Sequence, residues 1–375
     1  MFSDLAIYTR DIKAMKKRIF QGEIPCVNAH PVDNKVNYGD LSLPEEREVD
    51  FWYVLPLAGQ SNAMAYGEGL PLPDSLDRPD PRIRQLARRA SVTPGGRRCS
   101  YNEIIPADHC LHDVQDMSIF NHPRAILEKG QYGCVGQGLH IAKKMLPYLP
   151  DNAGILLVPC SRGGAAFTSG DTGSFSPCSG ASSDSMRWGI NMPLYFDLVS
   201  RTKAALDFNP RNRLLAVCWM QGEFDLMSEH YQEQPRLFND MVDAFRGELQ
   251  DYSERCYSGN SYTVPWLCGD TTWYWKTEYP ETYACIYGNY RNQLERYVYF
   301  IKFQDEQERG LTNEPEEDRD NPEYGYLGSG WRTESNWTTP LRSSHFSSQA
   351  RRGVVAGGFA NVIIRLMEYS DNILK

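Results

Sequence analysis

The feature that most constrains the fold is an alternation of two kinds of segment, which starts near Phe51 and continues almost to the end of the 375-residue chain. Short, nearly continuous apolar runs are typical of strands buried on both faces, and they occur at 51–58, 154–159, 214–219, 265–268 and 297–303. Stretches with helical periodicity occur at 135–149, 193–208, 231–252, 282–297 and 348–369. This alternation predicts an α/β fold in which a mostly parallel sheet carries helices on both faces.

The first 50 residues do not follow this alternation. They contain one candidate amphipathic helix at 11–20, a polar stretch dotted with prolines, and a charged run at 44–50. We therefore expect an N-terminal extension or small appended module at 1–50, followed by a single domain at 51–375.

The charge pattern argues against binding to nucleic acid. The formal net charge is -9, and no sustained stripe of lysine and arginine opposes it. The one locally basic run, at 82–89 with Arg97 and Arg98 beyond it, is interpreted as a solvated helix face, with a small anion-binding patch as the alternative.

The cysteines and the N-terminus bear on cofactors and on location. Ten cysteines include no C-x-x-C pair and no metal-ligand spacing, so we expect no metal, no other cofactor and a reducing compartment. The first 20 residues lack the apolar core of a signal peptide, and no stretch reaches the ~18 apolar residues of a membrane span. The prediction is a protein without membrane insertion, cytoplasmic by default, with the periplasm or release from the cell as alternatives.

Polar or glycine-rich clusters follow the predicted strands directly. Ser61 follows the first strand, residues 161–164 the second, residues 221–223 the third, and residues 270–275 the fourth. Because ligands bind at the carboxyl ends of the strands in open α/β sheets, we expect these clusters to form one site.

The residue types in these clusters suit acyl transfer. Ser61 in a strand-to-helix turn can present its hydroxyl as a nucleophile, although a turn serine without catalytic function has the same local sequence. Backbone N–H groups at Gly163 and Gly164 and the Gln221 amide are candidate oxyanion donors, the alternative for Gln221 being a buried amide satisfied by backbone. Of the seven histidines, His345 is favoured as the base because it lies on a loop just before the last predicted helix.

These residues, in this order, resemble the serine, glycine, amide and histidine blocks of the SGNH hydrolase superfamily. The chain is similar in particular to bacterial N-acetyl-9-O-acetylneuraminate esterases of the NanS type. That similarity runs from about Phe51 to near the C-terminus and is carried by AGQSNAMAYGEGLPLPD at 58–74, CWMQGEFDL at 218–226, CGDTTWYW at 268–275, ERGLTN at 308–313 and NWTTPLRSSHFS at 336–347. It implies a flavodoxin-like three-layer α/β/α fold and hydrolysis of the 9-O-acetyl ester of free or glycan-linked sialic acid.

The resemblance also implies roles for residues of this chain. Ser61 would attack the acetyl carbonyl, His345 would take the proton, and the oxyanion would be held by Ser61 N–H, Gly163 or Gly164, and Gln221. SGNH enzymes commonly carry an aspartate three residues before the histidine, where this chain has Arg342. Esterases of the NanS type themselves lack that acid, which implies a Ser–His dyad.

Other groups are assigned to the site with less support from the pattern. Glu223, Asp225 or Asp270 could orient the imidazole instead of the missing aspartate. An arginine is expected to bind the substrate carboxylate, and the further substrate-binding candidates are acidic or aromatic. The full set of substrate-binding candidates is Arg162, Arg187, Arg342, Glu223, Trp273 and Trp275.

Three competing functions follow from the same residues. An esterase of this fold could act on another acetylated sugar such as acetylated xylan. A non-catalytic module could bind sialic acid without hydrolysing it. A flavodoxin-like phosphate or nucleotide binder is disfavoured, because the glycine-rich phosphate loop that it needs is missing from the sequence. The sequence does not predict an oligomeric state.

Overall fold

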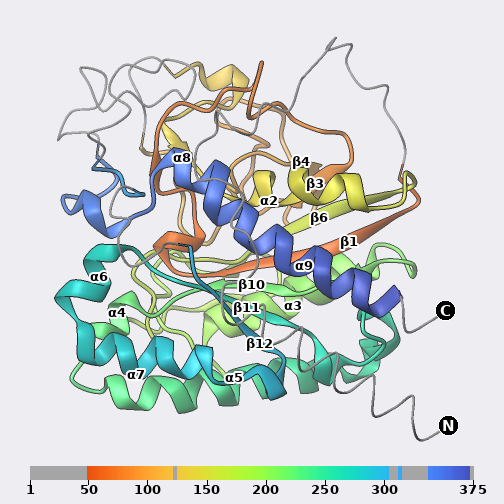
Figure 1. Ribbon diagram of the computed structural model, residues 1–375. Coiled ribbons are helices and arrows are strands. Elements are labelled where there is room, and N and C mark those ends of the chain that lie inside the picture. Colours follow the sequence, from red (N-terminus) through yellow and green to blue (C-terminus); the bar gives the residue numbers. More distant parts are fainter. Residues whose placement is uncertain (1–48, 121–124, 304–310, 315–336, 372–375) are drawn as a thin grey trace, which may run out of the picture.

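The computed structural model describes residues 49–120, 125–303, 311–314 and 337–371 (Figure 1). The helix predicted at 11–20 and residues 1–48 lie outside these residues, and the division of the chain at 50–51 stays a prediction.

A mostly parallel sheet runs through the centre of the molecule. Its eight strands follow the order β12-β11-β10-β1-β6-β3-β4, with β9 paired to β1. Within it, only the β3–β4 pair is antiparallel among the described residues. The strands are β1 (Phe51–Gly59), β3 (Ile83–Leu86), β4 (Ile104–Pro106), β6 (Ala153–Pro159), β9 (Arg213–Leu214), β10 (Val217–Met220), β11 (Trp266–Gly269) and β12 (Val298–Ile301).

Two further pairs of short strands lie outside this sheet. They are β2 (Gly67–Glu68) with β5 (Cys134–Val135), and β7 (Phe175–Ser176) with β8 (Gly180–Ala181). The helices are α2 (Gly138–Met145), α3 (Pro193–Asp207), α4 (Glu223–Leu226), α5 (Gln234–Glu248), α6 (Trp273–Glu278), α7 (Pro280–Arg291), α8 (Ser348–Ala350) and α9 (Ala356–Asp371).

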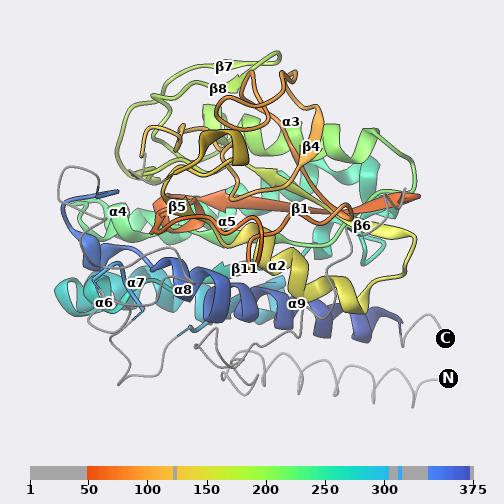
Figure 2. The same ribbon diagram turned by 90° about the horizontal axis from the view of Figure 1, so that it is seen from above.

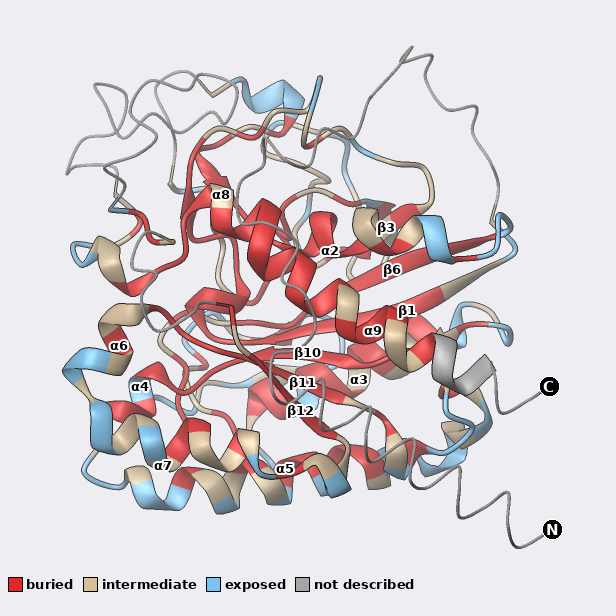
Figure 3. Cartoon of the chain, in the orientation of Figure 1, coloured by how far each residue is buried: buried red, intermediate tan, exposed pale blue. Residues whose placement is uncertain are grey.

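Helices cover the two faces of the sheet, as the sequence predicted. Figure 2 shows the sheet between α2 and α9 on one side and α3 on the other. Strand residues alternate between two cores: Leu55 and Leu57 of β1 pack with residues of α2 and α9, whereas Val54 and Ala58 pack with residues of α3, α5 and α7. In Figure 3 the strands are buried while the outer sides of α5 and α7 are exposed. The three-layer α/β/α prediction is therefore confirmed.

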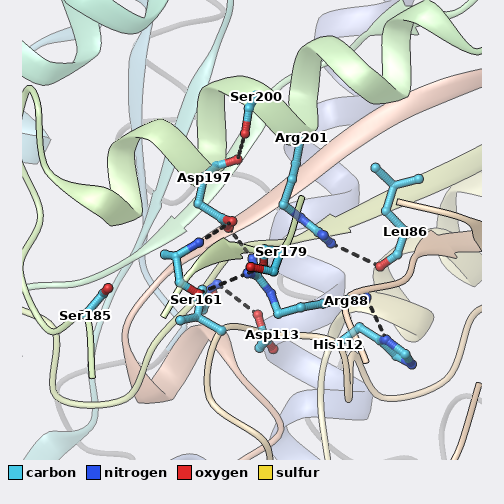
Figure 4. A network of polar contacts seen from close by, with 12 residues as sticks. Leu86, Arg88, His112, Asp113, Ser161, Ser179, Ser185, Asp197, Ser200 and Arg201 are labelled. Carbon is cyan, nitrogen blue, oxygen red and sulfur yellow. Dashed lines mark hydrogen bonds and ion pairs between the residues drawn. The ribbon is translucent and has the colours of Figure 1, made fainter. Parts of the chain in front are cut away.

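One interpretation of the sequence is wrong: the basic run at 82–89 is not a solvated helix face. Residues Ile83–Leu86 form β3, which pairs with β6 near the edge of the sheet. Arg88 follows this strand and forms a buried ion pair with Asp197 of α3 (Figure 4). The arginines of this run bond to a carboxylate and to backbone carbonyls that are distant in sequence. For example, Arg82 Nε donates to Ala153 O at 2.9 Å.

Two observations concern the wider questions of location and redox state. No helix among the described residues is long and apolar enough to cross a membrane. Nine cysteines fall within the described ranges, and none of them forms a disulfide.

Candidate active site

The ends of four neighbouring strands bring the predicted clusters together. Gly59 at the end of β1 is in register with Met220 at the end of β10, and Leu57 with Pro159 at the end of β6. Trp219 of β10 is in register with Cys268 of β11. Ser61, the 161–164 loop, Gln221 and the 270–272 loop therefore leave the same edge of the sheet from adjacent strands.

Ser61 begins a tight turn immediately beyond β1. Gly59 has φ +133°, and a Cβ there would lie 2.0 Å from the Met220 carbonyl oxygen, so only glycine fits. Gln60 N donates to that same oxygen at 2.8 Å, and a 3₁₀ turn follows at Ser61–Ala63. Ser61 is 6% exposed. The turn thus fixes the serine beside the end of β10.

The loop that carries His345 is tied to the Ser61 turn through Asn62. The Asn62 amide Nδ2 donates to Ser344 O at 3.1 Å, and Asn62 Oδ1 accepts from Phe346 N at 3.2 Å. One side chain next to Ser61 therefore bonds to the backbone on both sides of His345. The structure brings these two predicted residues into one neighbourhood.

The imidazole of His345 is held on one face and at one nitrogen. Tyr66 stacks on it, with ring centroids 4.6 Å apart and an interplanar angle of 21°. His345 Nδ1 lies 2.9 Å from Ser344 Oγ and 3.4 Å from Thr339 Oγ1. Each hydroxyl uses its own proton to donate to Leu341 O. Toward His345 the hydroxyl oxygens can therefore only accept, which places the imidazole proton on Nδ1. Burial, helped by the charge of Arg351, lowers the pKa of His345 to about 3, so the ring is neutral at pH 7.

The glycine loop after β6 approaches the same place. A Cβ on Gly163 would lie 2.6 Å from both Tyr66 Oη and Gln115 Oε1, which puts this glycine against the ring that stacks on His345. In the part of the chain that the structure describes, no protein acceptor pairs with the backbone N–H of Ser61, Gly163 or Gly164. These three groups can therefore donate to a bound oxygen.

Gln221 is a buried amide whose hydrogen bonds are made within the protein. Its Nε2 donates to Asp225 Oδ2 at 2.5 Å and to Ala165 O at 3.3 Å. Its Oε1 accepts from Gln234 Nε2 at 3.2 Å. The contact with Ala165 supports the glycine loop, and donation by Gln221 to a bound oxyanion requires that contact to be exchanged.

The three candidate arginines differ in what they already bind. Arg342 forms an ion pair with the buried Glu68 at 2.8 Å and lies over the Trp337 ring, 5.0 Å from its centroid. Arg187 Nε donates to Phe167 O at 3.3 Å. Arg162 donates to Ser183 O, Gln115 Oε1 and Gly163 O. Among the described residues neither Arg162 nor Arg187 has a carboxylate within ion-pair distance.

The acidic candidates do not contact the imidazole. Glu223 is 2% exposed and its Oε1 accepts from Asn62 Nδ2 and Thr271 Oγ1, each at 2.9 Å. Asp225 binds the 167–168 backbone, and Asp270 pairs with Lys276. The alternative in which one of these acids orients His345 gains no support, because the partners that the structure shows for all three lie elsewhere. The burial of Glu223 likewise argues against direct contact with a substrate.

The two tryptophans after β11 differ in burial. Trp275 is 6% exposed, and its Nε1 donates to Ser344 O at 3.0 Å, so it supports the histidine loop from the core. Trp273 is partly buried at the start of α6.

Sequence reasoning missed three residues that hold this site together: Asn62, Tyr66 and Arg351. Arg351 is fully buried in the π-helical turn Arg351–Val355 before α9 and donates to Asn62 O and Phe346 O. Asn62 and Tyr66 lie in the string whose resemblance was recognised, but only their positions in space reveal their contacts. Nothing in the local sequence distinguishes Arg351 from the neighbouring Arg352.

A parallel α/β sheet that gathers a serine turn, a glycine loop and a histidine loop at its carboxyl edge defines an α/β hydrolase-like protein. Residues 53–253 match the family model described as "Carbohydrate esterase, sialic acid-specific acetylesterase". Since this match covers more than half of the chain, the chain belongs to that family of carbohydrate esterases. It is a carboxylic ester hydrolase.

Individual relatives agree with this assignment. The chain is 57% identical over 316 residues to the Escherichia coli (strain K12) protein named "Probable 9-O-acetyl-N-acetylneuraminic acid deacetylase", covering 84% of this chain and 96% of the relative. A crystal structure of NanS is similar with a TM-score of 0.82 and 56% identity, over 86% of this chain and 99% of that one. An Arabidopsis thaliana protein shares the fold alone, with a TM-score of 0.51 and 16% identity over 84% of this chain and 98% of that one.

Proposed function

We propose that this esterase hydrolyses the 9-O-acetyl ester of N-acetylneuraminic acid and releases acetate through a Ser61–His345 dyad. The name of the 57% identical relative supports the substrate. The dyad is supported by two hydrogen bonds of Asn62, the neighbour of Ser61: its Nδ2 donates to Ser344 O and its Oδ1 accepts from Phe346 N, on either side of His345.

In this mechanism His345 acts as the base through Nε2. The Nδ1–H group donates a hydrogen bond to Ser344 Oγ and keeps its proton. The lone pair of Nε2 is then available to accept the Ser61 proton as Ser61 Oγ attacks the acetyl carbon. The imidazolium then returns a proton to O9 of the sugar as the ester bond breaks. Water, activated by the same nitrogen, hydrolyses the acetyl-enzyme. Two neutral hydroxyls thus take the orienting role that a carboxylate has in a triad.

The oxyanion would be held by backbone N–H groups of Ser61 and of Gly163 or Gly164, which have no other acceptor in the described part of the chain. Removing one such donor from an esterase site costs on the order of 3 kcal/mol in the barrier. Gln221 remains a candidate for the third donor. Its Nε2 could donate to the oxyanion once its hydrogen bond to Ala165 O is broken.

Arg162 is the arginine that we assign to the substrate carboxylate. Arg342 is already paired with Glu68. Arg162 lies in the glycine loop and donates to Gln115, whose amide bonds to the Tyr66 hydroxyl of the ring that stacks on His345. Because a hydrogen bond between charged groups is worth ~1.5–3 kcal/mol, Arg162→Met should raise KM for the sialate roughly tenfold or more. KM for the uncharged 4-nitrophenyl acetate should change much less than KM for the sialate, because that substrate has no carboxylate, and Arg187→Met is the matched comparison.

The test of the dyad is acetate release from 9-O-acetyl-N-acetylneuraminic acid by the wild-type protein, Ser61→Ala and His345→Ala. Each variant should lose on the order of 10³-fold or more in kcat while keeping the wild-type circular dichroism spectrum. Ser200→Ala and His230→Ala are matched controls at distant positions and should retain full activity. Near wild-type turnover by Ser61→Ala or His345→Ala would refute the role of that residue.

The competing functions make different predictions for the wild-type protein. An acetyl-xylan esterase would release acetate faster from acetylated xylan than from the sialate. A binding module would release acetate from neither substrate.

A further inference from the structure

Asn62 makes the full set of hydrogen bonds that a side-chain amide can make, although it is 1% exposed. Its Nδ2 donates to Glu223 Oε1 at 2.9 Å and to Ser344 O at 3.1 Å. Its Oδ1 accepts from Phe346 N at 3.2 Å and from Arg351 Nη2 at 3.1 Å. The amide is therefore held at four points from three separate segments of the chain.

Two buried ionisable side chains, one acidic and one basic, lie on either side of this amide. Glu223 is on the NH₂ side and Arg351 is on the carbonyl side, so the amide dipole points favourably toward both. Arg351 is fully buried, and its hydrogen bonds within the described residues go to neutral oxygens, including Met64 O and Gln137 Oε1. A flipped amide would place its NH₂ against the guanidinium and its oxygen against the carboxyl group. The pair therefore determines which way Asn62 faces.

We propose that Asn62, clamped between Glu223 and Arg351, is a positioning residue that sets the place of the His345 imidazole relative to Ser61. This inference rests on the proposed Ser61–His345 function. Asn62 is covalently next to one member of the pair and hydrogen-bonded to both neighbours of the other. A displacement of about 1 Å between reacting groups can cost on the order of 100-fold in rate.

Other hydrogen bonds also hold the loop that carries His345. We therefore expect removal of Asn62 to displace His345 without unfolding the protein. Trp275 Nε1 also donates to Ser344 O at 3.0 Å, and Thr272 Oγ1 donates to Ser343 O at 2.8 Å. These contacts keep the loop on the protein when Asn62 is removed, but neither of them comes from the serine turn. Since Asn62 is buried away from the substrate, its removal should lower kcat and leave KM nearly unchanged.

The first experiment compares Asn62→Ala with Asn212→Ala, using 4-nitrophenyl acetate as substrate. Asn212 is a fully buried amide at the other end of β1, where it accepts from Trp52 N at 2.8 Å and donates to Ala205 O at 2.7 Å. Both variants should lose thermal stability. Only Asn62→Ala should lose kcat, by about 100-fold, with KM within about threefold of wild type. A kcat within threefold of wild type for folded Asn62→Ala would overturn the proposal.

A double-mutant cycle tests whether Asn62 acts through His345. In a His345→Ala background the further change Asn62→Ala should have no additional effect on the residual rate, because the group that it positions is gone. The same fold-loss in both backgrounds would show that Asn62 acts independently of His345 and would overturn the proposal. An inactive wild-type protein would instead refute the proposed function.

A pair of isosteric substitutions covers the case in which Asn62→Ala does not fold. Asn62→Asp keeps the acceptor toward Phe346 and Arg351 but removes both donors and adds a negative charge beside Glu223. It should lower kcat at least tenfold. Adding Glu223→Gln restores a donor–acceptor contact and the original net charge, so the double variant should be at least threefold faster than Asn62→Asp. A double variant no faster than Asn62→Asp would contradict the proposal that Glu223 and Arg351 hold Asn62 in place.

Discussion

The buried state of His345 predicts an unusual pH dependence of catalysis. Burial and the nearby Arg351 lower the pKa of His345 to about 3, compared with about 6.5 for an exposed histidine. A base must be neutral to accept a proton, so kcat/KM should stay high well below pH 6.5. At pH 5 a histidine with a pKa of 6.5 is only about 3% neutral, whereas one with a pKa near 3 is about 99% neutral. The two cases differ by roughly 30-fold in kcat/KM.

The assay is initial-rate acetate release from 9-O-acetyl-N-acetylneuraminic acid between pH 4 and pH 8, at substrate concentrations well below KM. Circular dichroism at each pH checks that the enzyme remains folded. We expect kcat/KM at pH 5 to be within about threefold of its value at pH 7. An acid limb with a midpoint between pH 6 and pH 7 would refute the argument, because it would show that the imidazole of the free enzyme titrates like an exposed one.

The same burial has a consequence for stability with a definite sign. His140, which bonds to Asp77 at 2.7 Å, also has its pKa lowered to about 3 by burial. The unfolded chain binds protons at both histidines below about pH 6.5, while the folded chain does not. Their contribution is therefore fully present above pH 6.5 and is lost as the pH falls toward 3. Between pH 6.5 and pH 5 the loss is ~2 kcal/mol for each histidine, which urea unfolding at the two pH values can measure.

Three further predictions concern the polar network of Figure 4 and the absence of a metal requirement. Asp197→Ala leaves Arg88 buried without its partner and should lower the free energy of unfolding by ~3–5 kcal/mol, whereas Asp197→Leu combined with Arg88→Met should recover most of that loss; urea unfolding compares the two. Burial raises the pKa of Asp113 to about 8, so the folded state loses stability as the pH rises from about 4 through 8. Asp113→Asn keeps an acceptor for Ser161 N and removes that loss, and it should be more stable than wild type at pH 9 with a smaller difference at pH 5. EDTA should leave acetate release unchanged; loss of activity that zinc restores would contradict this.

The parts of the fold that the sequence predicted share one property. Strands such as β1 and β6 are buried on both faces, so their side chains form continuous apolar runs that stand out from their surroundings. The strand β3 was missed because it is only four residues long and its neighbouring arginines read as a solvated surface. Their carboxylate and carbonyl partners come from segments far away in the chain, and periodicity carries no information about such pairings.

The candidate site divides in the same way. Ser61, Gly163 or Gly164, and His345 could be proposed from the sequence because their residue types are tied to a chemistry and each one borders a recognisable element. What orients His345 could not be predicted. The structure puts hydroxyls of Ser344 and Thr339 at Nδ1, and no local pattern distinguishes these residues from the many other serines and threonines of loops.

The contacts show how the proposed site can orient His345 without a carboxylate at position 342. A buried aspartate beside the imidazole would stabilise its cation, but it would also carry a desolvation cost that only nearby donors can offset. In this chain the residue at 342 is an arginine, which pairs with Glu68 and anchors the start of the histidine loop. Neutral hydroxyls and a stacked tyrosine hold the imidazole, and the Asn62 amide bonds to the backbone on both sides of it. In the proposed mechanism the groups that orient the imidazole carry no charge, and the imidazolium would be stabilised by the oxyanion formed in the same step.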